Sequence, residues 1–160
     1  MSLTIVIVTY KSNHLIQKLI KSIPENYKIL IIENSLDKKL KNYLENDFRN
    51  VEVLLPKENL GYSGGINFGV KQAKTNHVLC LVADVIFDYK SFNEIEKVCN
   101  NLENFAIVAP TFNDESTFKN YIENNKNESK IFNLNKNKIL EVKEVDGAAF
   151  VVNKKKFYNE

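Results

Sequence analysis

The chain has 160 residues, of which 44% are hydrophobic and 26% are charged, and its formal net charge is +2. The balance is ordinary for a water-soluble globular protein, and we expect one domain over residues 1–160. The small net charge argues against a nucleic-acid partner. No apolar run is long enough to span a bilayer and the N-terminus lacks a signal-peptide pattern, so we expect a protein that is not transmembrane.

Short apolar runs alternate with helical periodicity along the first 110 residues. The predicted strands, rich in branched side chains, are Leu3–Thr9, Lys28–Glu33, Val51–Leu55, His77–Asp84 and Phe105–Pro110. The predicted helices run from Ser12 to Ile23, from Leu36 to Phe48, from the glycine-rich segment to about Lys74, and from Ser91 to about Leu102. Ser12 and Ser91 are the expected N-caps of two of these helices.

This alternation predicts an α/β fold, with a mainly parallel, Rossmann-like sheet and helices on both faces. Residues 113–138 are rich in Asn, Lys and Glu, and we expect an insertion there, as a short edge hairpin or a mobile loop. Strand-like alternation returns from Leu140 to Phe157. Cys80 and Cys99 lack metal-type spacing and are typical of reduced, packed thiols, which predicts a cytoplasmic protein.

Ligands of open parallel sheets bind beyond the carboxyl ends of the strands. The residues expected there are Thr9 and Tyr10, Glu33–Ser35, the glycine-rich segment and Asp84. Neither the P-loop pattern nor the Rossmann glycine fingerprint is present.

Four of the five glycines of the chain lie between Gly61 and Gly69. Because glycine is costly to order, this concentration needs a reason. We expect Gly61, Gly64 and Gly65 to form a tight loop whose backbone approaches a ligand. Gly69, in the helix that follows, is expected to pack closely against the sheet.

Five segments together resemble the family-two glycosyltransferases, the inverting enzymes of GT-A fold that use nucleotide-diphospho-sugars, and in particular their rhamnosyltransferase-like branch. These segments are IVIVTYKS from Ile5, IIENSLD from Ile31, NLGYSGGINFGVKQA from Asn59, VLCLVADV from Val78 and VDGAAFVVNKKKF from Val145. The resemblance covers nearly the whole chain, and the glycine-rich segment is its most specific part.

The resemblance implies a nucleotide-sugar-binding site. Its residues would be Thr9, Tyr10, Glu33, Asn34, Asn59, Gly61, Tyr62, Gly64, Gly65, Asn67 and Ala83. Glu33 stands where the family usually carries an Asp that accepts hydrogen bonds from the base or ribose, and Tyr62 would lie over or beside the pocket.

The resemblance also implies a divalent cation, Mn²⁺ or Mg²⁺, with Asp84 as its ligand, because carboxylate oxygens suit hard cations. Many relatives have Asp-x-Asp or Asn-Pro-Asp at this place. Here the segment is Val82-Ala83-Asp84, so only the last acid is kept and a reduced metal affinity is expected. Asp146, in Asp146-Gly147-Ala148, corresponds to the family segment beneath the donor sugar and the acceptor, and is a candidate for a catalytic role.

An inverting transfer needs a general base, which in the family lies in an acidic motif further along the chain. No Glu-Asp pair follows Asp146, and the acceptor-side C-terminal part of the family is absent, so a homodimer could cover the open edge. We therefore predict a metal-assisted glycosyltransferase of polysaccharide biosynthesis, acting on a glycan or lipid-linked acceptor. Its expected location is the cytoplasm, where peripheral contact with the inner face of the membrane would suit a lipid-linked acceptor. The alternative is an inactive sugar-nucleotide-binding or scaffold protein. A nucleotidyltransferase is disfavoured, because its glycine-rich basic signature is missing.

Overall fold

A computed structural model of the chain describes residues 3–102, 104–111, 121–124, 131–134 and 137–158. Its main sheet has six strands in the order β3-β2-β1-β4-β10-β5. These strands are β1 (Leu3–Thr9), β2 (Lys28–Glu33), β3 (Val51–Leu54), β4 (His77–Val82), β5 (Ile107–Val108) and β10 (Ala149–Asn153). Strands β3, β2, β1 and β4 are parallel, while β10 runs antiparallel to both β4 and β5. The prediction of a mainly parallel sheet is confirmed.

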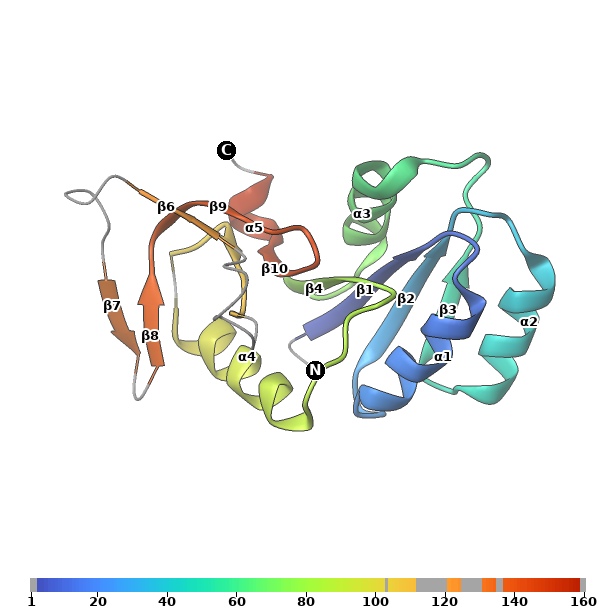
Figure 1. Cartoon of the computed structure of the whole chain (residues 1–160), viewed down its shortest axis with the longest axis horizontal. Coiled ribbons are helices and arrows are strands. Elements are labelled where there is room, and N and C mark those ends of the chain that lie inside the picture. The colour runs from blue at the N-terminus through green and yellow to red at the C-terminus, as the bar shows by residue number, and fades with distance from the viewer. Residues whose placement is uncertain (1–2, 103, 112–120, 125–130, 135–136, 159–160) are drawn as a thin grey trace.

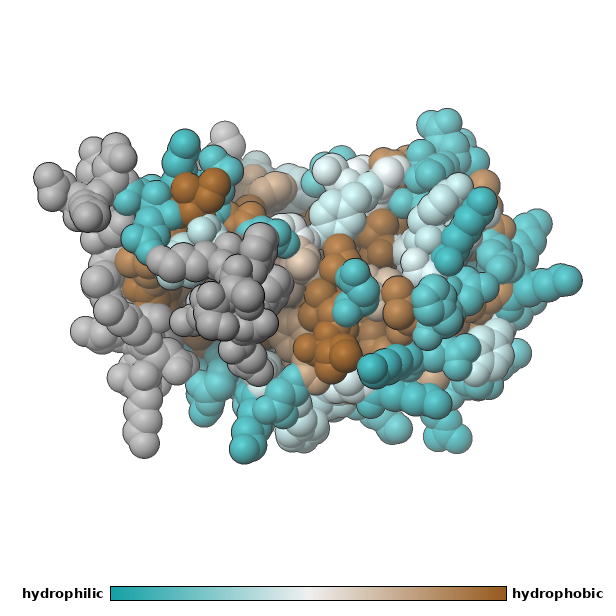
Figure 2. Space-filling view, in the orientation of Figure 1, coloured by the Kyte–Doolittle hydropathy of each residue, from teal (hydrophilic) through white to brown (hydrophobic). Residues whose placement is uncertain are grey.

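Helices cover both faces of the sheet, as predicted. Helices α1 (Asn13–Ser22), α2 (Lys38–Asp47) and α4 (Tyr89–Asn101) share one hydrophobic cluster with the sheet, and α3 (Gly61–Gln72) packs in a second cluster on the opposite face. In Figure 1, α3 lies above the sheet, α1 and α4 lie lower in the view, and α2 lies at its right end. Figure 2 shows hydrophilic residues over α1 and α2 and a hydrophobic region at the centre of this view.

The glycine-rich segment differs from the prediction, because α3 begins at Gly61 and so contains the glycines expected in a loop. Gly61 alone has a left-handed backbone, with φ of +65°. A Cβ on Gly65 would lie 2.9 Å from a methyl group of Val8, and one on Gly69 would lie 2.4 Å from a methyl group of Val6. Contacts of such length do not occur between real side chains, so both glycines allow α3 to lie directly on β1. The expected close packing of Gly69 is confirmed.

Two predicted caps also need correction. Helix α4 starts earlier than predicted: its N-cap is Asp88, whose carboxylate accepts a hydrogen bond from the Lys90 amide, and Ser91 lies inside the helix. Ser12 is the N-cap of α1, but its hydroxyl donates to the Tyr10 carbonyl, leaving the helix amides uncapped. The fifth predicted strand is reduced to the two residues of β5, at an edge of the sheet.

The region expected to be an insertion contains short strands wherever the structure describes it. Strands β7 (Ile131–Leu134) and β8 (Asn137–Leu140) pair with each other, and β6 (Tyr121–Glu123) pairs with β9 (Val142–Val145). The β7–β8 pair matches the expected hairpin, although it forms a sheet of its own and does not extend the main one. Residues 113–120, 125–130 and 135–136 of this region lie outside the described residues.

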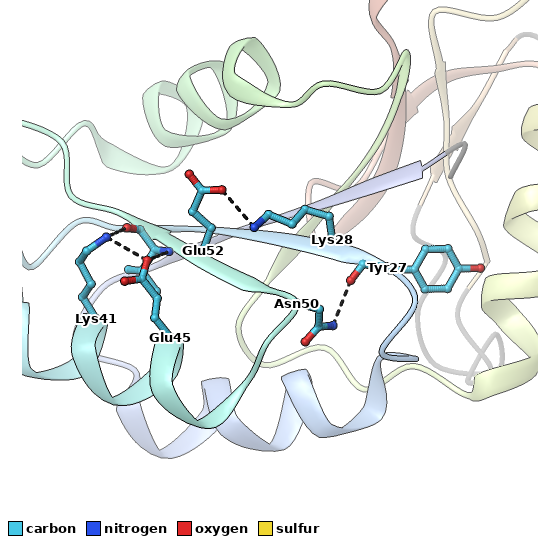
Figure 3. A network of polar contacts seen from close by, with 7 residues as sticks. Tyr27, Lys28, Lys41, Glu45, Asn50 and Glu52 are labelled. Carbon is cyan, nitrogen blue, oxygen red and sulfur yellow. Dashed lines mark hydrogen bonds and ion pairs between the residues drawn. The ribbon is translucent and has the colours of Figure 1, made fainter.

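The exposed edge of β3 is covered by two side chains of α2 (Figure 3). The Val53 amide donates to the Glu45 carboxylate at 2.8 Å, and the Lys41 ammonium donates to the Val53 carbonyl at 2.5 Å. Lys41 and Glu45 also form an ion pair with each other at 2.9 Å. Since unpaired edge strands invite pairing with other chains, this arrangement protects β3 at its centre.

Candidate functional site

The site is built from the ends of neighbouring strands. Thr9, the last residue of β1, is directly paired in register with Glu33, the last residue of β2, and the Asn34 amide donates to the Thr9 carbonyl at 2.9 Å. Thr9 is 2% exposed, and its Oγ1 is the buried side-chain oxygen that has no hydrogen-bond partner among the described residues. Such a hydroxyl costs about 1–3 kcal/mol of stability, so its presence at a strand end calls for a functional explanation.

The Glu33 carboxylate is fully buried and already bonded to the turn that follows β2. One oxygen accepts from the Ser35 amide at 3.0 Å and from the Ser35 hydroxyl, and the other accepts from the Asp37 amide at 2.6 Å. In this structure Glu33 therefore shapes the turn, and a nucleoside could reach its carboxylate only by displacing these donors.

Asn34 joins this turn to the start of α3. Its Nδ2 donates to the Gly61 carbonyl at 3.0 Å, and its Oδ1 accepts from the Leu60 amide at 3.3 Å. The Gly61 amide in turn donates to Oδ1 of Asn59 at 2.9 Å. Asn34 and Asn59 thus fix the entry to α3, and Asn34 joins turns that the sequence separates by 27 residues.

Tyr62 connects α3 to the segment Asp146-Gly147-Ala148, as its hydroxyl donates to the Gly147 carbonyl. Burial, with the nearby Asp146 carboxylate as a smaller cause, raises the pKa of Tyr62 to about 12, so the phenol remains a donor at neutral pH. Oδ1 of Asp146 accepts from the Ala148 amide at 2.8 Å. The Ala148 carbonyl accepts from the Val82 amide at 3.1 Å, which places this turn beside the end of β4.

The turn after β4 carries the predicted metal ligand. Ala83 is buried, whereas the Asp84 side chain is exposed and has no bonded partner among the described residues. Within those residues, no three His, Cys, Asp or Glu side chains are grouped closely enough to hold a metal ion. Asp88 caps α4 and does not supplement Asp84. A carboxylate exposed in this way suits Mg²⁺ or Mn²⁺ when phosphate oxygens and water complete the ligand set.

Two further predicted residues lie apart from this chain of contacts. Tyr10 is 51% exposed, and the Lys11 ammonium lies 5.3 Å from the centre of its ring. Asn67 is exposed on α3 and lines a groove of about 180 Å³ together with Tyr62, Phe150 and Phe157. Gly64 and Gly65 belong to α3 and not to a loop, which corrects the prediction of a loop that approaches a ligand. Gly65 faces β1, where it allows close helix packing.

Sequence reasoning missed two strained turns at the same edge. Lys11, after β1, has φ of 53°, and Leu36, after β2, has φ of 61°. Side-chain-bearing residues rarely adopt this conformation, and such residues concentrate at functional sites. No sequence signal predicts a left-handed Lys or Leu, whereas Ser35 and Asp37 could have been suspected as turn-forming residues after a strand.

The α/β sheet, the helix that lies on β1 and the polar strand ends define a domain of the GT-A class. The chain matches the family model described as glycosyl transferase family 2 over residues 4–159. It belongs to this family. No curated protein matches the chain.

Two solved structures share the fold across 96% of this chain. Residues 1–349 of S. aureus TarS in complex with UDP match with a TM-score of 0.62 and 16% identity, over 47% of that chain. The mannosyltransferase PcManGT from Pyrobaculum calidifontis in complex with GDP-Man and Mn²⁺ matches with a TM-score of 0.64 and 12% identity, over 45% of that chain. The present chain therefore spans less than half the length of either protein.

Two other predictions concern the cysteines and membrane-spanning helices. Cys80 and Cys99 are free and buried, as expected for packed thiols. None of the described helices combines the length and the apolar character that crossing a membrane requires.

Proposed function

We propose that this chain binds a nucleotide-diphospho-sugar at the carboxyl edge of β1, β2 and β4 and transfers the sugar to a glycan or lipid-linked acceptor. The observation that carries the proposal is the continuous set of contacts through Thr9, Asn34, Gly61, Tyr62 and Gly147, which gathers residues from four parts of the chain at one edge. Membership of glycosyl transferase family 2 supports the same function.

The unpartnered Thr9 hydroxyl and the strained Lys11 turn beside it are the proposed nucleoside contacts. The hydroxyl is buried in this structure, so its use requires a local movement that exposes it. Lys11, two residues after Thr9, is held in a strained left-handed conformation, and such residues cluster at functional sites. Glu33 would act through the turn that it holds, unless the ligand displaces the Ser35 and Asp37 donors.

Asp84 is the proposed ligand of a divalent cation shared with the diphosphate. When bound, such a cation neutralises the charge that builds up on the leaving nucleoside diphosphate. Transfer with inversion further requires a base that takes the proton of the acceptor hydroxyl as it attacks the anomeric carbon. Asp146 is a weak candidate, because one of its oxygens already accepts from the Ala148 amide.

This state of Asp146 also favours the second candidate, a binding protein without transferase activity. The two are separated by incubating the chain with a sugar nucleotide, a divalent cation and an acceptor, because only the enzyme releases the nucleoside diphosphate. The expected cytoplasmic location, contact with the inner face of the membrane and homodimer stay predictions.

The test of the binding site is a thermal-shift comparison of UDP, GDP and their sugars, with and without Mn²⁺. Replacing Asp84 by Ala should remove the part of the shift that depends on Mn²⁺. The matched control is Asp88→Ala, which removes a helix cap four residues away and should lower the unliganded melting temperature while leaving the Mn²⁺-dependent shift unchanged. A full Mn²⁺-dependent shift in Asp84→Ala would contradict the metal role of Asp84.

A further inference from the structure

A second cavity, of about 260 Å³, lies at the opposite end of β4, where this strand begins. It is bordered by the first residue of β4, the last residue of β10, the end of α4 and the start of α5 (Lys154–Phe157), which are labelled in Figure 1. Along β4, His77 in this cavity is five residues from Val82 at the candidate site, a separation of roughly 17 Å at 3.3 Å per residue. The cavity is therefore distinct from the proposed donor site.

The walls of this cavity offer hydrogen-bond donors and positive charge. Lys155 and Lys156 are exposed at its rim, and His77 lines it. Asn153 is 6% exposed, and while its Oδ1 accepts from Asn76 at 3.0 Å, its Nδ2 has no acceptor among the described residues. None of the described residues that line the cavity is a carboxylate.

The fold holds these groups in place with backbone amides and with the ammonium group of a single lysine of the run 154–156. The Lys154 ammonium donates to the Ala73 carbonyl at 2.6 Å. The amides of Lys154 and Lys155 donate to the carbonyl and to the side-chain oxygen of Asn76, at 2.9 and 3.0 Å. The ammonium groups of Lys155 and Lys156 form no ion pair among the described residues, so both are available to a ligand.

We propose that this cavity binds a small phosphate-bearing anion, held by Lys155, Lys156 and the side-chain amide of Asn153. Two ammonium groups and an amide N–H supply charge-assisted hydrogen bonds, which phosphate oxygens accept strongly. The described part of the lining carries no carboxylate that would repel an anion. The volume of the cavity lies just below the roughly 300–1,000 Å³ that is typical of pockets for drug-sized ligands, which suits a phosphate with a small attached group.

The two histidines of the chain allow a site-specific test, since His77 lines the cavity and His14 lies at the start of α1. Inorganic phosphate is titrated into the protein in the presence of EDTA, at constant ionic strength set with sodium chloride, while the ring protons of both histidines are followed by NMR. We expect a saturable shift of the His77 signals and none of the His14 signals. Burial lowers the pKa of His77, and a bound anion should raise it again.

The double variant Lys155→Gln with Lys156→Gln should abolish the saturable shift, because the substitutions remove both charges from exposed positions without disturbing the core. The matched control is Lys18→Gln with Lys21→Gln on α1, two exposed lysines that should be dispensable. Asn153→Asp is a second variant: it keeps the acceptor for Asn76, replaces the free donor by a carboxylate, and should also abolish the shift.

Three results would overturn the proposal. These are equal shifts of His77 and His14, a His77 shift that grows without saturating, and a saturable shift that survives in the Lys155/Lys156 variant. Because EDTA removes the cation on which Asp84 is proposed to act, the outcome is independent of the donor site. Loss of the Mn²⁺-dependent response to nucleotides in Asp84→Ala would neither support nor weaken this second site.

Discussion

The Tyr62 hydroxyl donates a hydrogen bond to the Gly147 carbonyl, across 85 residues of sequence. The ring lies close against Gly147 as well, because a Cβ on that glycine would be 3.4 Å from the ring. This contact ties the first turn of α3 to the turn before β10, the two segments that flank the end of β4. Tyr62 thus positions one part of the candidate site relative to another.

Replacing Tyr62 by Phe removes the hydroxyl and keeps the ring. We expect the free energy of unfolding to fall by about 1 kcal/mol, the usual worth of one hydrogen bond, as measured by urea denaturation. Hydrogen exchange of the Ala148 and Val82 amides should accelerate, because Ala148 belongs to the turn that Tyr62 holds and the Val82 amide donates to the Ala148 carbonyl. Tyr10→Phe is the control, since its exposed hydroxyl makes no hydrogen bond among the described residues. Unchanged exchange at Ala148 would show that Tyr62 does not position this turn.

Replacing Thr9 by Val should separate stability from binding. Valine has nearly the same shape and no unpartnered hydroxyl, so the free energy of unfolding should rise by about 1–3 kcal/mol. The thermal shift produced by UDP or GDP should shrink, since the hydroxyl is a proposed nucleoside contact. The control, Thr4→Val, lies on the same strand but removes a hydroxyl that is hydrogen-bonded to the Thr75 hydroxyl at 2.8 Å, and should destabilise. A Thr9→Val protein that binds nucleotide as tightly as the wild type would refute the contact.

Replacing Gly69 by Ala tests the packing of α3 on β1. Helix propensity alone favours alanine by about 1 kcal/mol. The added methyl group would meet Val6 at 2.4 Å, in a part of β1 that is fully buried, and overpacking of this kind costs about 1–3 kcal/mol. We expect the clash to prevail and the midpoint of urea unfolding to decrease. Ser63→Ala, at an exposed position of the same helix, should be neutral or slightly stabilising, and a stable Gly69→Ala protein would contradict the close approach.

The stability of the fold should fall in alkaline solution. Burial raises the pKa of Cys80 and of Cys99 from 9.0 to about 12, so both thiols stay protonated in the native state while the unfolded chain releases their protons. Their contribution is complete below pH 9 and is lost as the pH rises toward 12. Each thiol can remove up to about 1.4 kcal/mol per pH unit in this window. Urea denaturation at several pH values measures the slope, which Cys80→Ala should reduce; a flat profile above pH 9 would contradict the burial of the thiols.

The sequence predicted the approximate positions of the first four strands and of the helices between them, and it placed polar residues at the strand ends. Each of these features depends on periodicity or turn chemistry within a few neighbouring residues. Strands β3 and β4 end one and two residues earlier than predicted, and α3 begins earlier, at Gly61. The concentration of glycine between Gly61 and Gly69 likewise indicated a close approach. The residues that these glycines approach could not be inferred, because Val6 and Val8 are distant in sequence and meet α3 only in the folded chain.

Tertiary structure alone decided two features: the insertion of β10 between β4 and β5, and the contact of Tyr62 with Gly147. Both depend on which distant segments pack together. Local residue patterns carry the tendency to form a strand or a helix. The pairing of distant segments is set by the packing of the whole domain.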